Sequence, residues 1–135
     1  MKPFPKTQDS IVLRTDYSDP QAWDDLCAEI GKPVGSVRAR VSFVSDVEYA
    51  GRTVEQLVAA LGDNPYQPFL FVTDSETFSN PERSLLVVDL WGEPGRTFRV
   101  VPSEVQSVQD NLSIANMDFE EFAEAVDRDG VFRGF

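Results

Sequence analysis

The chain has 135 residues, of which 12 are basic and 23 acidic, so its formal net charge at pH 7 is -11. It contains no histidine and a single cysteine, Cys27, which excludes imidazole-based catalysis, an intrachain disulfide and CxxC metal or redox motifs. Hydrophobic residues make up 41% of the chain, enough for a real core. We expect one α/β domain over residues 1–135, with residues 1–9 flexible or loosely docked.

The acidic composition also bears on partners and location. Because an acidic chain repels phosphate backbones, we expect no nucleic acid partner. No apolar run is long enough for a membrane span or a secretion signal, so we expect no membrane partner and a cytoplasmic protein. The lone Cys27 agrees with a reducing compartment. Basic proteins or cations suit the negative field better.

The first half of the chain predicts strands that alternate with helices. An apolar strand over residues 10–16 precedes a helix that Asp19 caps. Cys27 falls on the apolar stripe of that helix, which predicts a core residue rather than a nucleophile. Residues 36–44 alternate between apolar and polar side chains, as in a strand with one buried face. The capping box at residues 53–56 predicts a second helix.

The second half begins with strands. Residues 69–72 and 85–88 are short, continuous apolar runs, typical of central strands that are covered on both faces. We expect a polar loop at residues 73–84 to join them. A turn at Pro94-Gly95 favours a hairpin between the strand at 85–88 and a further strand at 97–101.

Two helices and an aromatic tail complete the chain. One helix begins at Pro102 and the other at Asp118, and residues 130–135 are too apolar to remain undocked. The order β-α-β-α-β-β-β-α-α predicts a mixed sheet of about five strands flanked by about four helices.

Aspartates follow several of the predicted strands. If those strands are parallel, their carboxyl ends share one edge, where Asp16, Asp74 and Asp89 would lie close together. Carboxylates suit Mg²⁺ or another divalent cation, so one hypothesis is a metal site for phosphoryl transfer or hydrolysis. The favoured alternative is structural, because aspartate is an ordinary capping and turn residue and such a site needs no cofactor.

The acidic residues concentrate near the end of the chain. Residues 104–129 include eight acidic side chains and one arginine. On the last helix, Glu120, Glu121, Glu124 and Asp127 are expected to face outward. One interpretation is a solvated face that keeps the protein in solution, and the alternative is a docking surface for a basic protein partner.

Two arginines flank the predicted fifth strand. Arg96 and Arg99 are expected to form internal ion pairs with carboxylates, and an anion site is the alternative. Asn111 and Asn116 lie in the connection between the last two helices, where their side chains can cap helix ends or contribute to a loop site.

Several stretches resemble a known family. They are LLVVDL at 85–90, EPGRTFRVVP at 93–102, NLSIANMDF at 111–119 and DGVFRGF at 129–135, and LRTD at 13–16 fits as well. Together they resemble a bacterial family of small acidic proteins classed as a domain of unknown function. The resemblance implies a bacterial cytoplasmic protein and supplies no catalytic residue.

Three functions remain open from the sequence. The first is a non-enzymatic protein-binding or regulatory module, comparable to an inhibitor or immunity protein, that uses its acidic helical face. The second is the divalent-metal-dependent enzyme described above. The third is a homo-oligomeric structural module that associates through a sheet edge or the aromatic tail.

Overall fold

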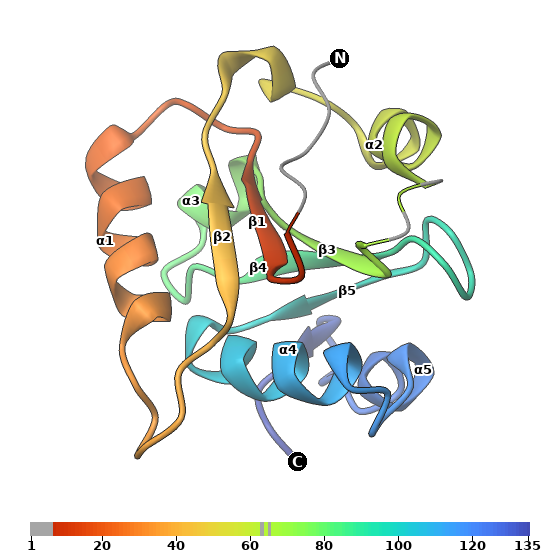
Figure 1. Ribbon diagram of the computed structural model, residues 1–135. Coiled ribbons are helices and arrows are strands. Elements are labelled where there is room, and N and C mark those ends of the chain that lie inside the picture. The colour runs from red at the N-terminus through yellow and green to blue at the C-terminus, as the bar shows by residue number, and fades with distance from the viewer. Residues whose placement is uncertain (1–6, 63, 65) are drawn as a thin grey trace.

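The computed structural model describes residues 7–62, 64 and 66–135, and this part of the chain forms one α/β domain. Its sheet has six strands in the order β2-β1-β3-β4-β5-β6 (Figure 1). The strands are β1 Ser10–Arg14, β2 Val41–Val44, β3 Phe69–Thr73, β4 Leu85–Asp89, β5 Thr97–Val100 and β6 Val131–Phe132. The helices are α1 Pro20–Gly31, α2 Val54–Leu61, α3 Ser75–Ser79, α4 Val105–Ser113 and α5 Phe119–Ala123, with short 3-10 turns at Val47–Tyr49 and Pro102–Glu104.

Strand direction reverses from β3 to β4 and reverses back from β4 to β5. β1 is parallel to both β2 and β3, as expected for strands joined through helical crossovers. β4 is antiparallel to β3 and to β5, while β6 is parallel to β5. The predicted mixed sheet is therefore confirmed, as is the predicted hairpin between β4 and β5.

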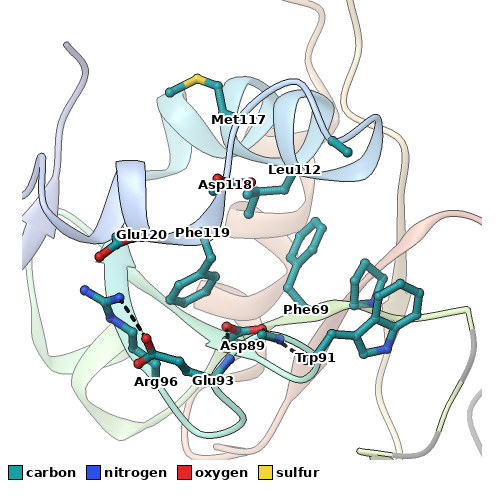
Figure 2. Close-up of a pocket in the computed structure, with 13 residues that line it drawn as sticks. Phe69, Asp89, Trp91, Glu93, Arg96, Leu112, Met117, Asp118, Phe119 and Glu120 are labelled. Atoms are coloured by element: carbon teal, nitrogen blue, oxygen red, sulfur yellow. Dashed lines mark hydrogen bonds and ion pairs between the residues drawn. The ribbon is translucent and has the colours of Figure 1, made fainter.

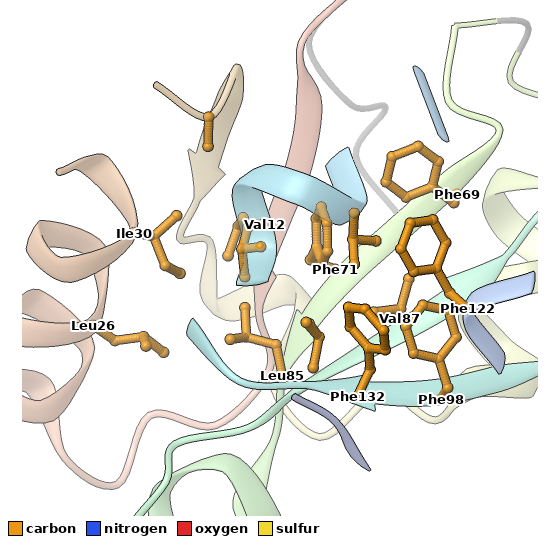
Figure 3. Packing of buried hydrophobic residues seen from close by; sticks show 14 of the residues in the cluster. Val12, Leu26, Ile30, Phe69, Phe71, Leu85, Val87, Phe98, Phe122 and Phe132 are labelled. Atoms are coloured by element: carbon orange, nitrogen blue, oxygen red, sulfur yellow. The ribbon is translucent and has the colours of Figure 1, made fainter. Parts of the chain in front are cut away.

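Apolar side chains fill both faces of the sheet. On one face, α1, α4 and α5 cover a row that crosses four neighbouring strands, made of Val12, Phe71, Val87 and Phe98 (Figure 3). On the other face, Tyr49 and two leucines of α2, Leu57 and Leu61, cover the alternate residues. Side chains alternate between faces along each strand, so continuous apolar runs produce two separate cores.

Local hydrogen bonds explain where the helices begin. Asp19 Oδ1 accepts from the amide of Ala22 at 3.0 Å, which caps α1 as predicted. In the capping box of α2, the Gln56 amide donates to Thr53 Oγ1 at 3.2 Å, and Thr53 N donates to Gln56 Oε1 at 2.9 Å.

Two segments differ from the expectations. The loop expected at residues 73–84 contains α3, because Asp74 accepts from the amide of Thr77 at 3.1 Å and forms a capping box. The strand expected from residue 36 begins instead at Val41. Ahead of it, Val34 and Val37 pair across a tight turn in which Gly35 has a φ of 63°.

The chain ends are held differently. The expected docking of the tail is confirmed, because its residues form β6 beside β5. In the N-terminal segment, residues 1–6 lie outside the described residues. The buried Gln67 side chain donates to the carbonyls of Thr7 at 3.1 Å and Asp9 at 2.9 Å. In the described part of the chain, no helix is long and apolar enough to cross a membrane.

Aromatic contacts fasten α5 and the tail to the sheet. The fully buried Phe122 ring lies 5.1 Å from Phe132 and 6.2 Å from Phe98, measured between centroids. Substitution Phe122→Ala should lower the free energy of unfolding by about 3–5 kcal/mol, because it leaves a cavity among these rings. Phe135→Ala is the control, since that side chain is 80% exposed. Urea titration would measure both, and equal losses would contradict this account.

Candidate functional site

The structure separates the three strand-end carboxylates of the metal hypothesis. Asp16 and Asp74 follow the parallel strands β1 and β3 at one edge of the sheet. Asp89 ends the antiparallel strand β4 and pairs with Phe69 at the start of β3. Five residues of extended chain between Phe69 and Asp74 span about 16 Å. The expected shared site is therefore wrong, and no cluster of three or more potential metal ligands occurs among the described residues.

Asp74 is held by Arg99 from β5. Arg99 Nη2 donates to Asp74 Oδ2 at 2.6 Å and Nη1 donates to Oδ1 at 3.1 Å, and Arg99 also pairs with Glu76. Burial alone would raise the pKa of Asp74, but the bonds from Arg99 and Thr77 outweigh it, so the pKa is lowered. The ion-pair expectation for Arg99 is confirmed, and its guanidinium serves to fasten α3 to the sheet.

Asp89 organises the turn between β4 and β5. Its Oδ1 accepts from the amides of Trp91 at 3.0 Å and Gly92 at 3.1 Å, and its Oδ2 accepts from Glu93 N at 2.8 Å. A Cβ added at Gly92 would lie 3.1 Å from Asp89 Oδ2, so glycine allows this close approach. The carboxylate therefore has a structural function that fixes the position of Trp91.

A pocket of about 420 Å³ lies between this turn and the connection from α4 to α5 (Figure 2). This volume falls in the usual range for ligand sites, about 300–1,000 Å³. The lining residues are Pro68, Phe69, Asp89, Trp91, Gly92, Glu93, Arg96, Leu112, Ala115, Met117, Asp118, Phe119 and Glu120. Segments that are far apart in the sequence thus meet in one surface hollow.

The walls of the pocket are aromatic. Phe69 and Phe119 approach it from the sheet and from α5, and the Trp91 ring stands at its side (Figure 2). Trp91 is 55% exposed, while its Nε1 donates to the carbonyl of Asn64 at 3.2 Å. Phe119 packs against Phe98 with centroids 4.9 Å apart, so that wall is anchored to the core. A flat apolar side chain or the stem of a long cationic one would fit against these rings.

The charges around the pocket are mostly negative. Four carboxylates and one guanidinium line it, which leaves three net negative charges. Arg96 Nη1 lies 3.7 Å from Glu93 Oε1, so the expected ion pair of Arg96 is confirmed. Asp118 and Glu120 are exposed on the opposite wall. We call this hollow the acidic pocket.

The two asparagines shape the connection that forms one wall. The Asn111 carbonyl accepts from the amides of Asn116 at 3.0 Å and Met117 at 3.3 Å, and Asn116 Nδ2 donates to Asn111 Oδ1 at 2.8 Å. Ala115 between them has a φ of 55°, in the left-handed region where helices often end. These contacts give the asparagines a helix-ending function, consistent with the capping expectation.

The acidic face of α5 is only partly available. Glu120 and Glu124 are exposed, while Glu121 Oε1 accepts from the amide of Asp118 at 3.0 Å in a capping box. Asp127 Oδ2 lies 2.7 Å from Arg133. The same guanidinium also holds Glu82 and Asp129, each at 2.7 Å, so much of the charge near the tail is balanced internally.

The aromatic lining cannot be recognised from the sequence. The sequence predicts a strand at Phe69 and a helix at Phe119, but the meeting of the two residues depends on tertiary structure. Trp91 is the one signal in the sequence, because a large aromatic residue inside a polar turn has no evident local function.

Cys27 is half-buried, and burial followed by the nearby Asp24 raises the pKa of its thiol to about 11, which agrees with a core residue.

The Asp74–Arg99 pair should make stability depend on pH. A carboxyl with a lowered folded-state pKa stabilises the fold above its unfolded pKa of about 3.9, and this stabilisation is lost as pH falls through the folded pKa. Arg99→Gln should cost about 1–3 kcal/mol near pH 7, and the cost should shrink in acid. Urea unfolding across pH, with NMR titration of Asp74, would measure it.

The control for this prediction is Arg96→Gln, which breaks an ion pair with the exposed Glu93. It should change the free energy of unfolding by less than about 1 kcal/mol. An unchanged titration of Asp74 in the Arg99 variant would contradict the assignment.

Asp89 should be needed for the turn. Asp89→Ala removes the acceptor of three amides and should cost about 1–3 kcal/mol, with altered fluorescence of Trp91. Asp89→Asn keeps one carbonyl oxygen and should cost less. Thermal unfolding and emission spectra would measure both effects, and a neutral Asp89→Ala substitution would rule out this function of the side chain.

Comparison with known proteins agrees with the resemblance found in the sequence. No curated protein matches the chain. A family model described as a domain of unknown function, DUF6924, matches residues 9–135, which is nearly the whole chain and includes every residue of the acidic pocket. The chain therefore belongs to the DUF6924 family.

Proposed function

We propose that this protein is a non-enzymatic protein-binding module whose acidic pocket receives a basic segment of a partner protein. The observation that carries the proposal is the combination of an aromatic lining, in which Trp91 is exposed, Phe119 half-buried and Phe69 buried, with three net negative charges. A segment that places lysine or arginine beside apolar residues would satisfy both properties. Inhibitor-like or immunity-like regulation of a basic partner is one form of this function.

Aromatic walls and carboxylates favour a cation for related reasons. The face of an aromatic ring carries partial negative charge, so a cation over Trp91 is stabilised by about 0.5–1 kcal/mol at an exposed site. Carboxylates at Glu93 and Glu120 add hydrogen bonds to an ammonium or guanidinium group. Arg96 competes with the incoming cation, because it already occupies Glu93. The affinity for a basic segment therefore depends on how readily the ion pair between Arg96 and Glu93 breaks.

The outer face of α5 extends this surface. Glu120 belongs to both the pocket and the helix, and Glu124 lies one helical turn further along the same face. A basic segment longer than the pocket can continue along this face. Of the four residues expected to bind a partner, Glu120 and Glu124 are the two that we include.

The proposed setting is the bacterial cytoplasm. Support comes from the resemblance of the sequence to a bacterial family and from the lone Cys27, which suits a reducing compartment. The strong negative charge would also raise the rate at which a basic partner is captured there.

Titration with a short peptide tests the proposal. The probe is an acetylated and amidated tetrapeptide of alternating arginine and valine, and the control peptide replaces arginine with glutamate. Binding would be measured by calorimetry and by fluorescence of Trp91, since the other tryptophan, Trp23, is buried. We expect binding of the basic peptide, weaker binding at high salt, and none of the acidic peptide.

Matched variants locate the binding. Replacing Glu93 and Glu120 together with glutamine should weaken binding about tenfold, or about 1.4 kcal/mol. Arg96→Gln should strengthen it, because it frees Glu93. The control replaces Asp24 and Asp25 on α1 with asparagine and should leave affinity unchanged. Equal binding of both peptides, or no effect of the pocket variant, would refute the proposal.

A further inference from the structure

A second feature of the surface complements the acidic pocket. Residues 32–45 contain Lys32, Arg38 and Arg40 and no acidic residue, although the whole chain carries a net charge of -11. In the described part of the chain, none of these three side chains forms an ion pair. We call residues 32–40 the basic hairpin.

The basic hairpin also presents apolar side chains. Val34 is 55% exposed and Val37 is 45% exposed, and the two lie across the turn that Gly35 forms. The Val34 amide donates to the Val37 carbonyl at 2.6 Å, and the Val37 amide donates to the Val34 carbonyl at 3.1 Å. Exposed valines held between unpaired cations are the chemistry that the acidic pocket favours.

The hairpin is pre-organised, which lowers the entropic cost of docking it. Its turn is closed by two hydrogen bonds, and its far end is tied to α4, where the Arg40 amide donates to Gln109 Oε1 at 2.9 Å. A segment that is already ordered loses less conformational freedom on binding than a flexible one. Residues 32–38 are all exposed, so this shape is available to another molecule.

The hairpin does not reach the pocket of its own chain. It leads into the edge strand β2, whereas the pocket is lined by the start of β3, the end of β4 and the turn before β5, two or more strands away across the sheet. At about 4.8 Å between neighbouring strands, the separation is about 10 Å or more. In Figure 1 the loop before β2 lies at the lower left and α5 lies at the right. Within one chain the two features are therefore separate, and a second molecule can bring them together.

We propose that the basic hairpin of one copy of this chain docks in the acidic pocket of another copy. The inference rests on the proposed function, and it names a second copy as one basic partner. Valine side chains of the hairpin would contact Trp91 and Phe119, while Lys32 and Arg38 would pair with Glu93 and Glu120. Because the two surfaces are different, the contact is heterologous and builds a row of copies unless a ring closes.

Sedimentation velocity of the whole chain tests this association. At an ionic strength of about 0.01 M, the weight-average mass should rise about twofold or more with concentration, and added salt should reverse the rise. A hairpin variant with Lys32→Ser and Arg38→Ser should remain monomeric, as should a pocket variant with Glu93→Lys and Glu120→Lys. The control, Asp24→Lys and Asp25→Lys on α1, has the same charge as the pocket variant and should still associate.

Mixing the two monomeric variants gives the decisive result. One supplies an intact pocket and the other an intact hairpin, so together they should form a 1:1 complex that grows no further. A wild-type chain that stays monomeric in low salt, a single variant that still associates, or a mixture that stays monomeric would overturn the inference. If the wild-type chain stays monomeric but binds the arginine–valine peptide, only self-association fails. If neither occurs, the proposed function fails too.

Discussion

The direction of β4 decides where the acidic pocket lies. Only residues 74–84 separate β3 from β4, and a parallel connection needs a crossover of a dozen or more residues. β4 therefore returns antiparallel, and Asp89 arrives at the end of the sheet opposite Asp74. The same reversal places the turn after β4 beside the connection from α4 to α5, and the acidic pocket forms between them.

Carboxylates in this protein divide into those with a structural partner and those without one. Asp19, Asp74 and Asp89 cap helices or turns, and Asp127 and Asp129 share Arg133 with Glu82. Glu93 and Glu120 stay accessible beside aromatic rings, although Arg96 partly screens the first of them. Net charge alone therefore says little about where a partner binds, whereas the partners of each carboxylate say more.

Local sequence signals predicted most of the helices and strands. The features that the sequence did not predict depend mainly on tertiary structure. The caps at Asp19 and Thr53 depend only on residues close by in the sequence, so the sequence pattern predicted the start of both helices. α3 was missed because polar residues with a capping box resemble a loop when no apolar stripe accompanies them. The metal hypothesis was wrong because the sequence of a single strand does not show whether it runs parallel or antiparallel to its neighbours, and β4 is antiparallel to β3. The pocket could not be predicted either, since Phe69, Trp91 and Phe119 come from three separate segments.

The unpaired cations of the basic hairpin and the net negative charge of the acidic pocket, where Arg96 offsets one of four carboxylates, also give the molecule an electric dipole. The internal ion pairs of Arg99 and Arg133 contribute little to it, because each guanidinium lies against its carboxylates. The electrostatic field of exposed charges acts before contact, over distances up to a Debye length of about 8–10 Å. A charged molecule approaching this protein would therefore be rotated into alignment before it touches the surface, and the orientation would be lost as salt is added.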